Sequence, residues 1–223
     1  MRKAWLQVLL VIVAGQGSSL AADFKRFEFQ PFGGFSVSGS IPLEADDGTR
    51  YGSVSVKSSH NIGATFGVNF NVLDAVEVYW RRQFSEGQLP PEIAVPLPTG
   101  GPTSFDLKID QYHCNFIHHY QMPDPRAMPY VMAGLGATTY YGAGSVQRYS
   151  MSRFSFALGG GIKYFFTRHV GFRGEVRWAP TVLSASDSGF WCSVGGAGAN
   201  CVIHLKTTMQ NQLDLTGGIV FRF

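Results

Sequence analysis

Acidic and basic side chains set within otherwise apolar stretches are the residues of this sequence with the clearest capacity for chemistry. Alternate residues of a β-strand point to the same face, and these charges share the polar parity of their stretches. Because an unpaired buried charge costs several kcal/mol, we favour a paired network over an ion path. We expect Glu77 and Glu175 to pair with Arg81, Arg173 or Arg177. The whole set is Glu28, Glu77, Arg81, Arg173, Glu175, Arg177 and Asp214.

Three histidines invite a catalytic interpretation. His113, His118 and His119 lie close together in one stretch. A Ser–His hydrolase needs a base held by hydrogen bonds beside its nucleophile, and no histidine stands near a serine and an acid in such a pattern. The sequence also lacks a glycine-rich phosphate loop and close His or Cys spacing for a metal, so we expect no cofactor.

The three cysteines differ in their surroundings. Cys192 and Cys201 share the polar, glycine-rich segment WCSVGGAGANC, and we expect them to form a local disulfide after export. Two cysteines and the distant His204 are too few ligands for a zinc site. Cys114 lies in an apolar alternating stretch, which favours a packing role.

Eight alternating stretches must position these residues. In each, aromatic and aliphatic side chains occupy one parity while Gly, Ser, Thr, Asn and charged residues occupy the other. In the fourth stretch Leu107 and Ile109 fall on the parity opposite to Tyr112, which predicts a bulge near Asp110. The aromatic residues Trp80 and Trp178 suit an interface girdle better than a ligand platform. The stretches are 27–37, 62–71, 76–83, 105–120, 131–138, 154–166, 170–178 and 212–223.

The connections between the stretches alternate in length. Short connections cover 72–74, 121–128 and 167–169, and long ones cover 38–60, 85–104, 142–152 and 181–207. Short turns at one rim and long loops at the other are typical of a membrane barrel, whose closure also satisfies every backbone amide in lipid. Within the first loop, Tyr51, Val54 and Val56 alternate, which indicates a hairpin. The sequence therefore predicts an all-β fold, an eight-stranded antiparallel up-and-down transmembrane β-barrel.

The start of the chain predicts export. Arg2 and Lys3 precede the apolar run 4–14, and Ser19-Leu20-Ala21 offers a cleavage site. The run is too short to span a bilayer of about 30 Å as a helix. We therefore expect a signal peptide over 1–21 and a barrel domain over 22–223. Removing the signal leaves 16 basic against 15 acidic residues, which argues against nucleic acid as a partner.

The end of the chain and one further stretch carry a family resemblance. The segment LTGGIVFRF alternates up to Phe221 and Phe223, and GFRGEVRW forms the seventh stretch. The chain resembles the eight-stranded outer-membrane β-barrel family of OmpA transmembrane domains, OmpX/Ail and opacity-type surface antigens. The resemblance implies that Phe221 and Phe223 form a C-terminal signal for the barrel-assembly machinery.

The resemblance also frames the expected function. We expect a protein of the cell outer membrane with a closed, charge-paired interior and extracellular loops, acting in structure or surface interaction and not as an enzyme. One alternative is a narrow porin or an OmpW-like conduit for small or apolar solutes, and a lipid-modifying membrane enzyme is less favoured. The expected partners are outer-membrane lipids, the assembly machinery and an extracellular ligand of the loops. A closed sheet has no free edge, which favours a monomer.

Overall fold

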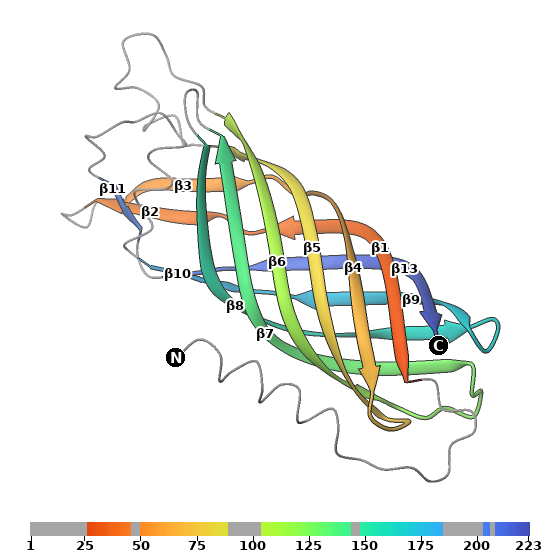
Figure 1. Cartoon of the computed structure of the whole chain (residues 1–223). Coiled ribbons are helices and arrows are strands. Elements are labelled where there is room, and N and C mark those ends of the chain that lie inside the picture. The colour runs from red at the N-terminus through yellow and green to blue at the C-terminus, as the bar shows by residue number, and fades with distance from the viewer. Residues whose placement is uncertain (1–25, 46–49, 89–103, 144–147, 185–202, 206–207) are drawn as a thin grey trace, which may run out of the picture.

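The computed structural model describes residues 26–45, 50–88, 104–143, 148–184, 203–205 and 208–223. Eight long strands form the wall of a barrel (Figure 1). They are β1 (Phe27–Ser38), β4 (Ser59–Asn69), β5 (Asp74–Gln88), β6 (Ser104–His119), β7 (Ala127–Ala143), β8 (Arg148–Phe165), β9 (Val170–Trp178) and β13 (Gln212–Arg222). No described segment is a helix of the length and apolarity needed to cross a membrane.

Antiparallel pairing closes the sheet on itself. Each long strand pairs with the next along the chain, and β13 returns to pair with β1. Following paired residues once around the barrel from His119 returns to β6 at Ile109, ten residues away. Such a stagger tilts the strands against the barrel axis, as closure requires. The predicted eight-stranded antiparallel barrel is confirmed.

Short strands extend the wall at one end. The first loop forms the expected hairpin from β2 (Ile41–Ala45) and β3 (Arg50–Val56). Three more short strands lie at this end, β10 (Thr181–Leu183), β11 (Ile203–Leu205) and β12 (Thr208–Gln210), of which β10 pairs β12 and β11 pairs β2. We call this the loop end. The opposite end, with connections 70–73, 120–126 and 166–169, is the turn end.

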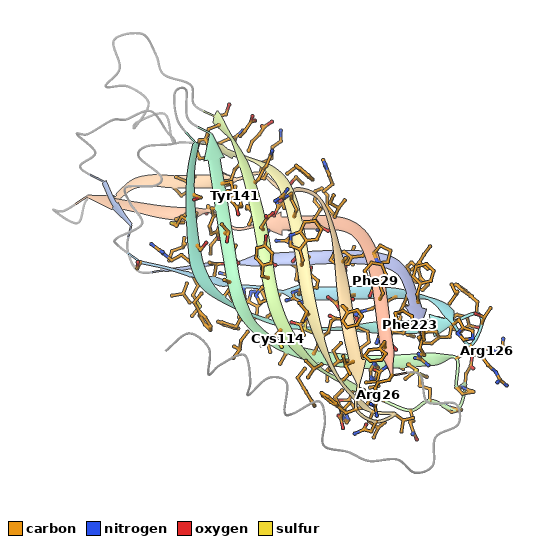
Figure 2. All side chains as sticks on the ribbon, in the orientation of Figure 1. Arg26, Phe29, Cys114, Arg126, Tyr141 and Phe223 are labelled. Carbon is orange, nitrogen blue, oxygen red and sulfur yellow. The ribbon has the colours of Figure 1, made fainter. Side chains whose placement is uncertain are left out.

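The two faces of the wall differ in polarity. Outward residues such as Phe29, Val78 and Leu135 are exposed, whereas inward residues such as Glu77, Arg81 and Arg177 are buried. Figure 2 shows Phe29 and Cys114 on the outer surface. A soluble sheet would bury the first set and expose the second, so this wall suits an apolar surrounding.

The interior changes character toward the loop end. Nine buried residues form an apolar tier there: Ile41, Val54, Val56, Phe105, Leu107, Ile109, Tyr140, Met151 and Leu183. On the outer face at this height, a row of paired polar residues crosses four strands, and we call it the boundary row: Arg82, Asp110, Thr139 and Ser152. Above the boundary row the outer face is mostly polar, apart from Phe84 and Tyr141, and the inner face is apolar, as in a water-soluble barrel.

The bulge predicted near Asp110 is wrong. Residues of β6 pair with β5 and β7 without any register shift through this point. Leu107 and Ile109 simply continue the inward parity of Gln111 into the apolar tier. Asp110 points outward, where its carboxylate accepts hydrogen bonds from Arg82 Nε at 2.7 Å and Nη2 at 2.6 Å.

Inward glycines make room for large inward side chains. A Cβ on Gly63 would collide with the Phe32 ring, and one on Gly161 would lie 2.7 Å from the Tyr130 hydroxyl. A narrow barrel interior is filled by matching large and small residues in this way.

Candidate functional site: the polar interior

The polar interior is organised in layers, beginning at the turn end with Glu28. Lys163 Nζ lies 2.5 Å from Glu28 Oε2, and Arg222 Nε lies 3.1 Å from Oε1. Asn69 Nδ2 also donates to Oε1, at 3.2 Å. Strands β1, β4, β8 and β13 are joined across the bore by this one carboxylate.

The next layer is built on Arg173, which stands between two carboxylates. Its guanidinium forms ion pairs with Glu77 of β5 and Glu175 of its own strand. Tyr130 completes the layer, because its hydroxyl accepts from Arg173 Nε and donates to Glu175 Oε2, both at 2.6 Å. Each charge here has an opposite charge and a hydrogen bond, the condition under which buried charges are tolerated.

A stack of three side chains crosses the bore above this layer. The Arg177 guanidinium lies over the Tyr79 ring, 3.9 Å from its centroid. Phe32 stacks on Tyr79, with ring centroids 5.2 Å apart and an interplanar angle of 21°. The three residues come from β9, β5 and β1. We call this group the crossbar, since it spans the interior from three sides.

The uppermost polar layer pairs Arg81 with Asp214 at 2.6 Å, and both side chains are fully buried. Arg81 Nη2 donates to Gln212 Oε1 at 3.0 Å, and Gln111 Nε2 donates to the same oxygen at 2.8 Å. The apolar tier lies directly above. The bore is thus filled by paired polar groups below and by apolar side chains above.

The predicted charge set is distributed over these layers. Glu77, Arg173 and Glu175 meet in one layer, Arg81 meets Asp214 in another, and Arg177 lies 3.9 Å from Glu175. Sequence reasoning placed Lys163 and Arg222 on polar faces but did not include them in the set, although both pair with Glu28. It also missed Tyr79 and Tyr130, which lie on inward parities that would have identified them. Among the described residues that point into the bore, the basic side chains of Arg81, Lys163, Arg173 and Arg177 are balanced by four buried acids, Glu28, Glu77, Glu175 and Asp214.

The histidines do not share a site. His113 is buried, and its Nε2 lies 2.9 Å from Ser155 Oγ, while its Nδ1 has no hydrogen-bond partner among the described residues. No acid therefore orients the ring as a hydrolytic triad requires. His118 points outward to Asp74 at 2.7 Å, and His119 points inward. Across the described ranges, no group of three or more His, Cys, Asp or Glu could hold a metal ion.

The remaining predicted residues lie away from the interior. Phe221 and Phe223 point outward and are exposed, and Cys114 is a free, exposed cysteine. Cys192 and Cys201 lie outside the described residues, as does the predicted signal peptide.

Comparison with known proteins agrees with this architecture. Neisserial surface protein A superposes with a TM-score of 0.57 at 13% identity, over 88% of this chain and 97% of that chain. OprG from Pseudomonas aeruginosa gives 0.56 at 16% identity, over 89% and 97% of the two chains. AlkL, determined in lipid bilayers, gives 0.53 at 15% identity, over 93% and 95%.

Sequence comparison supplies the family. No curated protein sequence matches the chain significantly. Residues 8–187 match the family described as "Outer membrane protein beta-barrel domain". The chain therefore belongs to this family of outer membrane β-barrel domains and is a protein of the bacterial outer membrane.

Proposed function

We propose that this barrel is a non-conducting outer-membrane protein whose interior is a structural core and whose role is exerted by its extracellular end. The crossbar of Phe32, Tyr79 and Arg177 carries the proposal, because it fills the bore from three strands. The balanced charge layers below it support the same conclusion. An ion following the axis would have to break several buried pairs, each of which is expensive to separate.

The extracellular end offers the surface for interaction. In outer-membrane barrels the short turns face the periplasm and the long loops face outward. Here β5–β8 rise past the boundary row, and the β2–β3 hairpin adjoins them, because β3 pairs with the end of β5. Loops on a rigid scaffold commonly carry recognition. We assign the barrel a structural or surface-interaction role, as a monomer that reaches the membrane through the barrel-assembly machinery.

Ion conductance tests this proposal. Purified protein, refolded and inserted into planar bilayers, is expected to give no steady current at modest voltage. Steady single-channel steps from the folded wild-type barrel would overturn the closed-core proposal.

The apolar tier favours a second candidate, a conduit for small apolar solutes. In the described residues, β8 pairs with β10 only at Ser155 and Thr181, so Met151 and Leu183 lie near a sparsely paired part of the wall. The test is uptake of a labelled alkane by cells that express the protein, compared with cells that carry an empty vector. Faster uptake supports the conduit, and equal uptake supports the closed barrel.

Catalysis is not part of the proposal. Ser155 and His113 form the one close Ser–His contact in the described part of the chain, and both side chains are buried in the packed interior. A purified-protein assay for lipase or deacylase activity is expected to give no turnover above buffer.

A further inference from the structure

Six buried polar atoms at the level of the crossbar and of the Arg81 layer have no hydrogen-bond partner among the described residues. None of the six side chains is more than 3% exposed. A buried polar group without a partner is costly, and nearly all such groups in proteins are bonded to the chain or to ordered water. We call these atoms the unpaired polar set: Tyr79 Oη, Arg81 Nε, Gln111 Oε1, His113 Nδ1, Arg177 Nε and Asp214 Oδ2.

The pairing of the strands brings the members of this set together. They occupy three register pairs, Tyr79 with His113, Arg81 with Gln111, and Asp214 with Arg177. The first two pairs are adjacent inward positions of β5 and β6, and the third joins β9 and β13 on the other side of the bore. Two contacts cross between the sides, because Arg81 binds Asp214 at 2.6 Å and Arg177 lies over the Tyr79 ring. The six unpaired atoms therefore belong to one contiguous group.

Other polar atoms of these side chains are already bonded. Asp214 Oδ1 accepts from Arg81 Nη1 at 2.6 Å, and Arg177 Nη2 donates to Asn115 Oδ1 at 3.3 Å. These bonds hold the side chains in place, so the remaining atom of each must find its partner where it stands.

The mixture of donors and acceptors in the set selects the kind of ligand. The two arginine Nε atoms can only donate a hydrogen bond, the Gln111 and Asp214 oxygens can only accept one, and the Tyr79 hydroxyl can do both. An anion would be repelled by Asp214, and a cation would be repelled by the arginines. The acids and bases that point into the bore already balance, so a bound ion would also add an uncompensated charge. A small neutral molecule that both donates and accepts fits the whole set, and water is such a molecule.

Two inward glycines leave room beside the set. Gly136 pairs with His113 and Gly159 pairs with Arg177, so neither neighbour adds a side chain to the bore at this height. The layer built on Arg173 lies below the crossbar, and the apolar tier lies above the Arg81 layer. Water held at this level is therefore enclosed from both ends, which agrees with a closed bore.

We propose that the unpaired polar set binds a cluster of ordered water molecules inside the barrel. A buried water makes about three hydrogen bonds with protein groups, and it can accept from one member of the set while it donates to another. The water links the β5–β6 side of the bore to the β9–β13 side, in addition to the Arg81–Asp214 pair. This site depends only on the geometry of the interior, whatever the extracellular end contacts.

Transfer of magnetisation from water to the protein in solid-state NMR tests the site. The wild-type barrel carries isotope-labelled arginine and is reconstituted in lipid bilayers, and the transfer is measured at each arginine Nε–H. Arg173 is the internal control, because it is buried in the same bore and its Nε donates to the Tyr130 hydroxyl at 2.6 Å. Transfer to Arg81 and Arg177 is expected to build up severalfold faster than transfer to Arg173. Equal build-up at all three overturns the site. A change in the Arg81 or Arg177 Nε–H shift when chloride is replaced by gluconate would show a bound anion and would also overturn it.

Two conservative variants give a second readout. Tyr79→Phe removes only the hydroxyl of the set and keeps the ring of the crossbar, and Tyr130→Phe removes a hydroxyl that has two side-chain partners. With water bonded to Tyr79 Oη, Tyr79→Phe lowers the midpoint of heat-modifiable gel migration, as Tyr130→Phe does. A hydroxyl without any partner destabilises the folded barrel, so its removal would raise the midpoint. An unchanged or raised midpoint for Tyr79→Phe overturns the site.

Discussion

The Arg177 guanidinium lies over the Tyr79 ring inside the barrel, 3.9 Å from the ring centroid. Arg177 comes from β9 and Tyr79 from β5, so the contact joins opposite parts of the wall. Phe32 also stacks on the Tyr79 ring, so that a cation and two aromatic rings lie together across the bore. Cation–π contacts are stronger where water is excluded. The crossbar therefore stabilises the packed interior, and its position across the bore also obstructs passage.

Glu175→Gln is expected to lower the heat stability of the barrel. The substitution removes a carboxylate that Arg173 and Tyr130 both contact, and it should cost about 1–3 kcal/mol. The matched control is Glu86→Gln, because the Lys57–Glu86 pair is at the surface and its loss should change stability by about 0.5 kcal/mol or less. The midpoint of heat-modifiable gel migration in detergent measures both. Equal midpoints for wild type and Glu175→Gln would contradict the buried pairing.

Arg81 and Asp214 should show strong coupling in a double-mutant cycle. Each single change, Arg81→Met or Asp214→Leu, leaves a fully buried charge without its partner and is expected to cost about 3–5 kcal/mol. The double variant should be less destabilised than the sum of the singles, because no unpaired charge remains. Urea unfolding of the barrel in lipid vesicles gives the four free energies. Additive losses would show that the two residues do not interact.

Two neighbouring glycines should respond in opposite ways to alanine. At the inward Gly63 a Cβ meets the Phe32 ring, so Gly63→Ala should destabilise the barrel by about 1–3 kcal/mol. At the outward Gly33 the nearest atom to a Cβ is Asn61 O at 3.7 Å, so Gly33→Ala should be neutral or stabilise by about 0.4–1 kcal/mol. Unfolding midpoints of the two variants check the assignment of the faces. If Gly33→Ala destabilised the barrel more than Gly63→Ala, the assignment of the inward and outward faces would be wrong.

The boundary row predicts where the outer wall leaves the lipid. Leu135 is 63% exposed and lies below the row, so Leu135→Arg should cost about 2–4 kcal/mol in a bilayer. Ser150 is exposed above the row, and Ser150→Arg should change stability by less than about 1 kcal/mol. Folding free energies in vesicles measure both variants. Similar costs would mean that the lipid extends past Arg82 and Asp110.

The alternation of side chains was sufficient to predict the barrel, its strand number and the inward position of the charges. It failed at Asp110 because the prediction assumed lipid outside the whole length of each strand. Above the boundary row the inner face of the wall is apolar, so Leu107 and Ile109 point inward without any bulge. The sequence also could not predict which charged side chains pair with one another. Which residues meet across the bore depends on the ten-residue stagger around the barrel, and this is a property of closure that no single strand contains.

The central claim is that the packed interior closes the bore, and ion conductance in planar bilayers tests it most directly. Wild type is recorded beside Tyr79→Ala/Arg177→Ala, which removes two members of the crossbar, and gel migration confirms that both are folded. The closed barrel predicts no steady current for wild type, and a porin recorded in the same bilayers shows that the assay detects an open bore. The charge layers and the apolar tier remain in the variant, so its current, compared with that of wild type, measures what the crossbar alone contributes to closure. Steady conductance of the wild-type protein at modest voltage would contradict the account.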